Sequence, residues 1–139
     1  MTYRFDGLIT PEDCSVLERN GVEFSTRDIR PIHNFWCVRM NETMEKAESA
    51  VDSGAKKLIA EASITSGLVI RYITWAGRID YLYGFEIKNS AIVESSRFDS
   101  SSSVILENQL IDVMSAIGLQ LPADGHFAPF ERGYWGEQT

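Results

Sequence analysis

Three consecutive strand-like stretches joined by short turns constrain the fold of this sequence more than any other feature. Residues 68–75, 79–87 and 91–95 are rich in β-branched and aromatic side chains, which favour extended strands. The connections at 76–78 and 89–90 are short enough to be hairpin turns, so neighbouring strands are expected to pair antiparallel. We therefore expect a sheet built around an antiparallel meander.

Two amphipathic helices are predicted on either side of this meander in the sequence. Apolar residues recur at three- and four-residue spacing over 44–62 and again over 104–117, which is the period of a helix with one buried face. Asn41 supplies an N-cap for the first helix, and Gly118 supplies the left-handed residue that ends the second.

The N-terminal part of the chain is predicted to add one short helix and two strands. Thr10 followed by proline and two acidic residues is typical of a helix start, and Gly21 is expected to end that helix. The aromatic and β-branched run at 34–40 predicts a strand, and 22–26 predicts a shorter one.

This order of elements predicts an α+β fold with a mixed or antiparallel four- to five-stranded sheet and helices packed on one face. The length of 139 residues corresponds to a single globular domain, 1–139. An irregular, aromatic-rich C-terminal tail is expected over 119–139, because Pro122, Pro129 and several glycines interrupt regular structure there.

The charge of the chain argues against a nucleic acid partner. The formal net charge is -7, from 13 basic and 20 acidic residues, and binding to a polyanion needs basic residues concentrated on one face. A protein partner that is basic or neutral at the contact is expected instead. Because no apolar run is long enough for a signal peptide or a membrane span, we expect a cytoplasmic location and no membrane partner.

No pattern typical of a catalytic centre is found. Cys14 and Cys37 are expected to be free, partly buried thiols, and His33 would lie about 13 Å from Cys37 along a strand, too far for a catalytic pair. The two His and two Cys lack metal-ligand spacing, and no glycine-rich nucleotide motif is present. We therefore expect no catalytic residues, no metal and no cofactor, and the sequence favours a protein that is not an enzyme.

Aromatic side chains gather in the meander and, less expectedly, in the polar, glycine-rich tail. Trp and Tyr beside Arg are typical anchors of protein interfaces, although the tail could equally fold back and cover the edge of the core. The candidate binding residues are Tyr81, Tyr83, Glu86, Phe127, Phe130, Arg132, Tyr134 and Trp135.

Three functional hypotheses follow. The leading one is a protein-binding module acting by occlusion, such as a small acidic inhibitor or immunity protein that neutralises a toxin, nuclease or defence enzyme. The second is a small-molecule-binding domain or minor enzyme with an aromatic pocket between sheet and helix, lined by Tyr72, Trp75, Tyr81 and Tyr83. The third is a secretion-type chaperone or structural homodimer.

Overall fold

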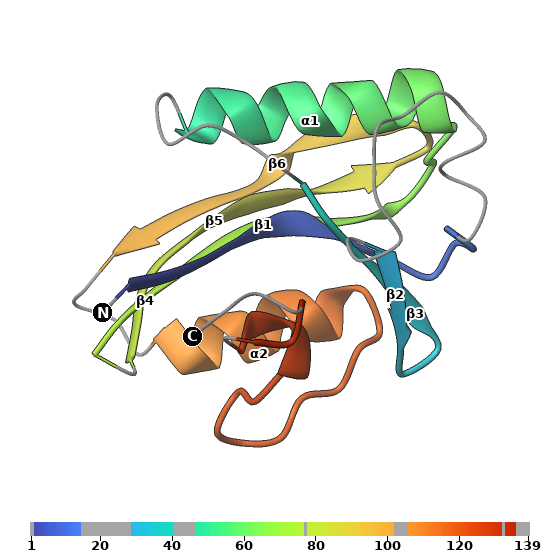
Figure 1. Cartoon of the computed structure of the whole chain (residues 1–139). Coiled ribbons are helices and arrows are strands. Elements are labelled where there is room, and N and C mark those ends of the chain that lie inside the picture. Colours follow the sequence, from blue (N-terminus) through green and yellow to red (C-terminus); the bar gives the residue numbers. More distant parts are fainter. Residues whose placement is uncertain are drawn as a thin grey trace.

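A computed structural model of the chain describes residues 2–14, 29–40, 47–76, 78–101, 106–131 and 133–135. Within them, six strands form one antiparallel sheet in the order β2-β3-β1-β4-β5-β6 (Figure 1). The elements are β1 (Thr2–Thr10), β2 (Ile29–Ile32), β3 (Phe35–Arg39), α1 (Ala47–Ala62), β4 (Gly67–Trp75), β5 (Arg78–Lys88), β6 (Ala91–Ser101), α2 (Leu106–Ala116) and the 3-10 helix η3 (Ala128–Phe130).

The α+β class is confirmed, whereas the number of strands and the placement of the helices match the prediction only roughly. The sheet has six strands rather than four to five, because the N-terminal segment forms the inner strand β1 and residues 29–32 form the edge strand β2. The two helices lie on opposite faces of the sheet rather than on one (Figure 1). We call these the α1 face and the α2 face.

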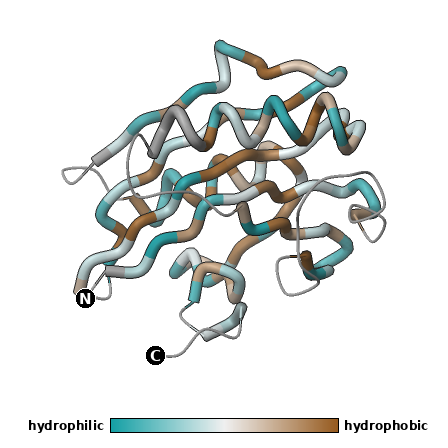
Figure 2. Tube along the Cα trace, turned by 45° about the horizontal axis from the view of Figure 1, so that its top comes forward, coloured by the Kyte–Doolittle hydropathy of each residue, from teal (hydrophilic) through white to brown (hydrophobic). Residues whose placement is uncertain are grey.

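Burial on both faces of the central strands explains why two covering layers are needed. On β4, Val69 packs towards α1, while Leu68 and Ile70 pack towards α2. On β1, Leu8 and Phe5 are likewise buried on opposite faces. Apolar segments therefore run along the inner strands, whereas α1 alternates between hydrophobic and hydrophilic positions (Figure 2). A sheet that is apolar on both faces must be covered on both.

The predicted meander is confirmed as β4, β5 and β6. Asn89 and Ser90 form the turn between β5 and β6, and both have positive φ angles, of 53° and 62°. Two successive left-handed residues define the turn that matches the twist of paired strands. At the end of α2, the amide of Leu119 donates to the Met114 carbonyl at 3.0 Å, and Gly118 has a φ of 89°, so the helix ends at the predicted glycine.

The helix start predicted at Thr10 is wrong. Thr10 is the last residue of β1, and its hydroxyl accepts a hydrogen bond from the Glu12 amide at 3.1 Å and donates one to the Ser66 carbonyl at 2.6 Å. A threonine oxygen can serve such a local turn as readily as a helix N-terminus. The remainder of that predicted helix and the strand predicted at 22–26 lie outside the described residues.

Both cysteines are free and buried, as the sequence predicted. Cys14 belongs to the core of the α1 face and Cys37 to the core of the α2 face. Burial, together with Glu12 and Asp13, raises the pKa of the Cys14 thiol to about 12, and burial raises the pKa of the Cys37 thiol well above its usual range. These thiols are therefore poor nucleophiles at neutral pH.

Neither described helix is both long and apolar enough to cross a membrane.

The C-terminal tail forms part of the core of the α2 face. Phe127, Phe130 and Trp135 are only 3%, 4% and 1% exposed. The Phe130 ring lies 4.9 Å from that of Phe5 on β1, and the Trp135 indole N–H donates to the Pro129 carbonyl at 2.9 Å. Of the two alternatives for the tail, the described residues show these three side chains in the core.

Trp135→Ala is expected to destabilise the fold by about 3–5 kcal/mol, because it removes a fully buried indole and leaves a cavity. Trp75→Ala is the matched control, since Trp75 is 54% exposed and its loss should change stability by only about 0.5 kcal/mol. Urea denaturation of both variants measures the difference. Equal stability of the two variants would show that the tail does not contribute to the core.

Candidate functional site

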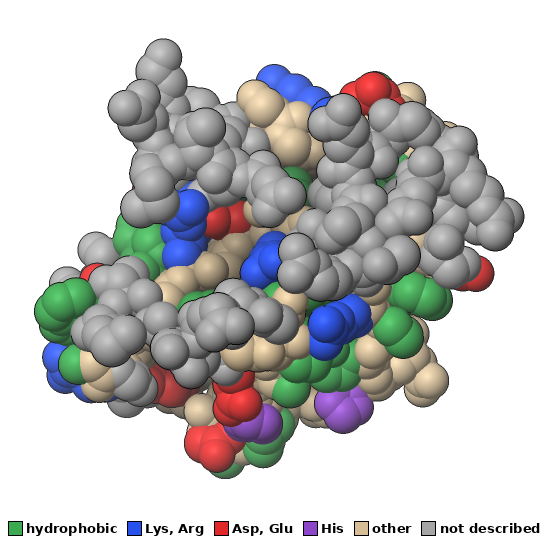
Figure 3. Space-filling model, in the orientation of Figure 1, with side chains coloured by type: hydrophobic (Ala, Val, Ile, Leu, Met, Phe, Trp, Pro, Cys, Tyr) green, Lys and Arg blue, Asp and Glu red, His purple; other side chains and the backbone are tan. Residues whose placement is uncertain are grey.

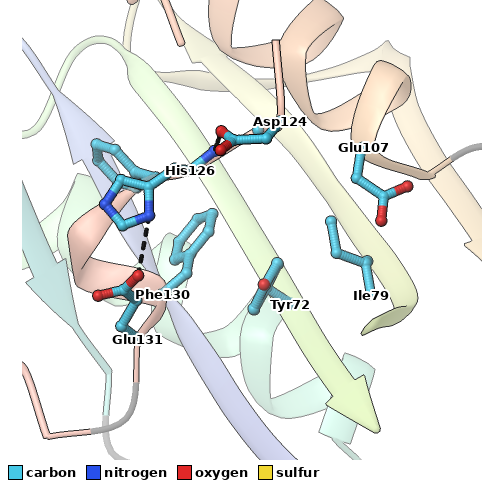
Figure 4. A pocket seen from close by; sticks show the side chains of 9 residues that line it. Tyr72, Ile79, Glu107, Asp124, His126, Phe130 and Glu131 are labelled. Atoms are coloured by element: carbon cyan, nitrogen blue, oxygen red, sulfur yellow. Dashed lines mark hydrogen bonds and ion pairs between the residues drawn. The ribbon is translucent and has the colours of Figure 1, made fainter. Parts of the chain in front are cut away.

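A cavity of about 190 Å³ opens on the α2 face, where the end of the β4–β5 hairpin, the first turn of α2 and the tail meet (Figure 4). We call it the acidic pocket. It is lined by Tyr72, Ile79, Glu107, Asp124, Gly125, His126, Phe127, Phe130 and Glu131.

The floor of the acidic pocket is a set of packed aromatic rings. The rings of Tyr72 and Phe130 stack at 4.4 Å between centroids, with 23° between their planes, and Phe127 meets Phe130 edge to face at 5.0 Å. Successive side chains of β4 point to opposite faces of the sheet. Arg71 points to the α1 face, and Tyr72, the next residue, therefore points to the α2 face. Because Phe127 and Phe130 belong to the core, the floor is held rigidly.

A tight turn brings the tail across the first turn of α2. The Gly125 amide donates to the Pro122 carbonyl at 2.8 Å, and Gly125 has a φ of 74°, which glycine adopts without steric cost. The turn sets Gly125 against the Glu107 backbone, where an added Cβ would lie 3.8 Å from the Glu107 Cα. Pro129 lies at the start of η3, where its fixed φ suits a helical turn.

Three carboxylates and one imidazole form the rim of the acidic pocket. Glu107 stands in the first turn of α2, and Asp124 and Glu131 come from the tail. Figure 4 shows Glu107 on one side of the Tyr72 and Phe130 rings and the His126–Glu131 pair on the other. His126 Nδ1 lies 2.9 Å from Glu131 Oε1, and the His126 amide donates to Asp124 Oδ1 at 2.9 Å.

The electrostatics of the acidic pocket favour a cationic ligand. Burial, followed by the charges of Glu107 and Glu131, raises the pKa of Tyr72 to about 12. The Tyr72 hydroxyl therefore stays protonated at neutral pH, and both carboxylates act on the centre of the floor. Aromatic faces carry partial negative charge, so the floor and the rim attract the same kind of group.

Of the predicted binding residues that the structure describes, only Phe127 and Phe130 lie together at this pocket. Tyr134 and Trp135 instead pack against arginines of the chain itself: the Arg30 guanidinium lies 5.2 Å from the Tyr134 ring centre, and that of Arg39 lies 5.3 Å from the Trp135 ring centre. Arg132 lies outside the described residues.

Tyr83 and Tyr81 lie on the other side of the sheet. The Tyr83 hydroxyl donates to Asp52 Oδ1 at 2.9 Å and accepts from Arg97 Nη1 at 2.8 Å, and Tyr81 shares this face by strand alternation. The pocket predicted from Tyr72, Trp75, Tyr81 and Tyr83 together is therefore wrong, because Tyr72 packs in the α2-face core and Tyr83 against the α1-face core.

Glu86 lines a second cavity, of about 180 Å³. Its carboxylate lies 3.6 Å from Lys88 Nζ, and its amide donates to Ser96 Oγ at 2.7 Å. The charge of Glu86 is therefore balanced by its neighbour, and this cavity has no excess of either sign to select a ligand.

The α1 face carries a polar network that the sequence did not suggest. Arg71 and Asp6 are 5% and 4% exposed and form an ion pair at 2.9 Å, and Arg4 joins the same carboxylate at 2.9 Å. Arg97 pairs with Asp52 at 3.0 Å and lies 4.6 Å above the centre of the Phe85 ring. The Arg71–Asp6 pair joins β4 to β1 within the sheet, and an ion pair this deeply buried is costly to break. The Arg97–Asp52 pair, whose side chains are partly exposed, joins β6 to α1.

The charged groups are distributed unevenly over the surface. On the face shown in Figure 3, Lys and Arg side chains lie across the middle of the molecule, whereas acidic side chains gather with a histidine at its lower edge.

The rim was missed because Glu107 and Tyr72 are distant in the sequence from the tail residues Asp124 and Glu131. In the sequence, nothing distinguishes Glu107, Asp124 and Glu131 from ordinary solvent-exposed acids. They form a candidate site only because the fold places them around Tyr72. The one available signal was the segment 124–131, in which acidic residues and a histidine flank two phenylalanines.

Comparison of the chain with protein-family models, with curated proteins and with solved structures finds no match. Within the part of the chain that the structure describes, no group of three or more His, Cys, Asp or Glu could hold a metal ion.

Spectrophotometric titration of tyrosine is expected to show one residue that ionises near pH 12 and is lost in Tyr72→Phe. Because the pKa of Tyr72 is raised from 10.0 to about 12 on folding, its contribution to stability is complete below pH 10 and is lost as the pH rises towards 12. Glu107→Gln should lower this pKa, and Glu61→Gln, on the exposed side of α1, should not. An unchanged titration curve for Tyr72→Phe would contradict the assignment.

Proposed function

We propose that the chain is a protein-binding module that acts by occlusion, and that the acidic pocket is part of the surface that meets a basic partner. A small acidic inhibitor or immunity protein that covers a toxin, nuclease or defence enzyme is the function that fits best. The observation that carries the proposal is the ring of Glu107, Asp124 and Glu131 around an aromatic floor.

Charge complementarity supports a basic partner. The net charge of -7 steers a cationic protein towards the chain over long distances. The rim carboxylates act at short range, beside rings that are fixed in the core. Occlusion needs such a surface and no reactive group, and the two thiols are buried with raised pKa values.

The size of the acidic pocket favours a macromolecular partner over a small-molecule ligand. Pockets that enclose metabolites or drugs usually measure about 300–1,000 Å³, whereas this one measures about 190 Å³. It suits one side chain projecting from a larger surface. The hypotheses of a secretion-type chaperone and a structural homodimer have no comparable observation in their support.

We infer a cytoplasmic place of action, because the two free, buried cysteines suit a reducing compartment.

Affinity capture from the natural host tests the proposal. The wild-type chain should retain a partner in stoichiometric amounts, and Glu107→Gln/Glu131→Gln should weaken its affinity at least tenfold, or by about 1.4 kcal/mol. The matched control is Glu61→Gln/Asp99→Asn, which changes the net charge equally at two exposed positions outside the pocket. Failure to retain a stoichiometric partner, or equal affinity of both double variants, would overturn the proposal.

A further inference from the structure

We propose that the acidic pocket recognises an arginine side chain, whose guanidinium lies on the Tyr72–Phe130 floor between Glu107 and Glu131. This inference rests on the proposed function, because the arginine is taken to belong to a protein partner. It goes beyond that function by naming the side chain that the pocket selects.

The arrangement of the acceptors matches a guanidinium. Glu107 and Glu131 come from different elements and lie on opposite sides of the aromatic floor (Figure 4), so a ligand that contacts both must donate in more than one direction while it covers the apolar rings. A guanidinium is planar, carries five N–H donors and stacks on aromatic faces. The oxygen Oε1 of Glu131 faces His126, and Oε2 is the second acceptor that this carboxylate can offer to a ligand.

Lysine fits this pocket less well. Its ammonium group is a compact and strongly hydrated charge, and it would have to give up much of its hydration to sit on the Phe130 and Tyr72 rings. A guanidinium is more weakly hydrated and keeps its edge donors while its face is buried. The pocket should therefore discriminate between the two side chains although both carry one positive charge.

The chain itself uses arginine in the same way beside this pocket. Arg30 lies over the rings of Tyr134 and Trp135, at 5.2 and 5.7 Å, and Arg39 lies over Trp135 at 5.3 Å. These rings and the floor of the acidic pocket belong to the same aromatic core. The acidic pocket differs from the Tyr134 and Trp135 rings in two ways. It has carboxylates at its rim, and no described arginine is among its lining residues.

Three capped tripeptides test the inference on the full-length protein: acetyl-Gly-Arg-Gly-amide, its lysine counterpart, and its citrulline counterpart, which keeps the shape of arginine without the charge. Two-dimensional NMR spectra should show saturable shifts at Tyr72, Gly125 and Phe130 with the arginine peptide. The lysine peptide should bind at least about fivefold more weakly, since it cannot stack or form the forked contact. The citrulline peptide should give no saturable shift.

Variants of the rim provide the control for simple charge attraction. Glu107→Gln and Glu131→Gln should each weaken binding of the arginine peptide about tenfold, the usual scale of a lost charge-assisted hydrogen bond. Glu61→Gln removes the same charge from the exposed side of α1 and should leave binding unchanged. Equal binding of the arginine and lysine peptides, equal effects of the three variants, or shifts confined to other residues would overturn the inference.

The outcome is distinguishable from that of the capture experiment. If a partner is held through the pocket but replacing its contacting arginines by lysine leaves the affinity unchanged, the arginine inference fails and the proposed function stands. If the arginine peptide binds as expected but no partner is captured, the proposed function fails and the arginine site stands.

Discussion

The whole structure depends on covering both faces of a sheet whose central strands are buried on both sides. β1 and β4 pair along nearly their full length, and their successive side chains are buried towards α1 and towards α2 in turn. Each helix can cover only part of a six-stranded sheet. The area that α2 leaves open on its face must be covered by another segment, and the C-terminal tail supplies it.

This constraint also produces the acidic pocket. A regular helix would have packed evenly on the sheet, but the tail descends through a turn at Gly125 and the single 3-10 turn Ala128–Phe130. Its phenylalanines point inward while its polar residues stay at the margin. A hollow with an aromatic floor and an acidic rim forms where the tail passes the first turn of α2. The core of the α2 face and the floor of the acidic pocket therefore share Phe127 and Phe130.

Local signals in the sequence account for the meander, for α1 and α2, and for the helix end at Gly118. They do not reveal which faces are buried. In residues 35–40, for example, Val38 and Cys37 lie on opposite faces of the strand, and both are fully buried. The Thr10 hydroxyl can accept a backbone hydrogen bond in a turn as well as at a helix start, so the residue type alone does not distinguish the two. The rim of the pocket depends on contacts between distant segments, such as Tyr72 with Phe130, which no local pattern encodes.

Native-state hydrogen exchange tests most directly whether the tail is an integral part of the core. The amides of Phe130 and Glu131 donate to Phe127 and Ala128 at 2.9 Å, and they should exchange only through global unfolding, with the same free energy of opening as the β4 amides. Exchange of these two amides through a local opening, while β4 stays fully protected, would contradict the account.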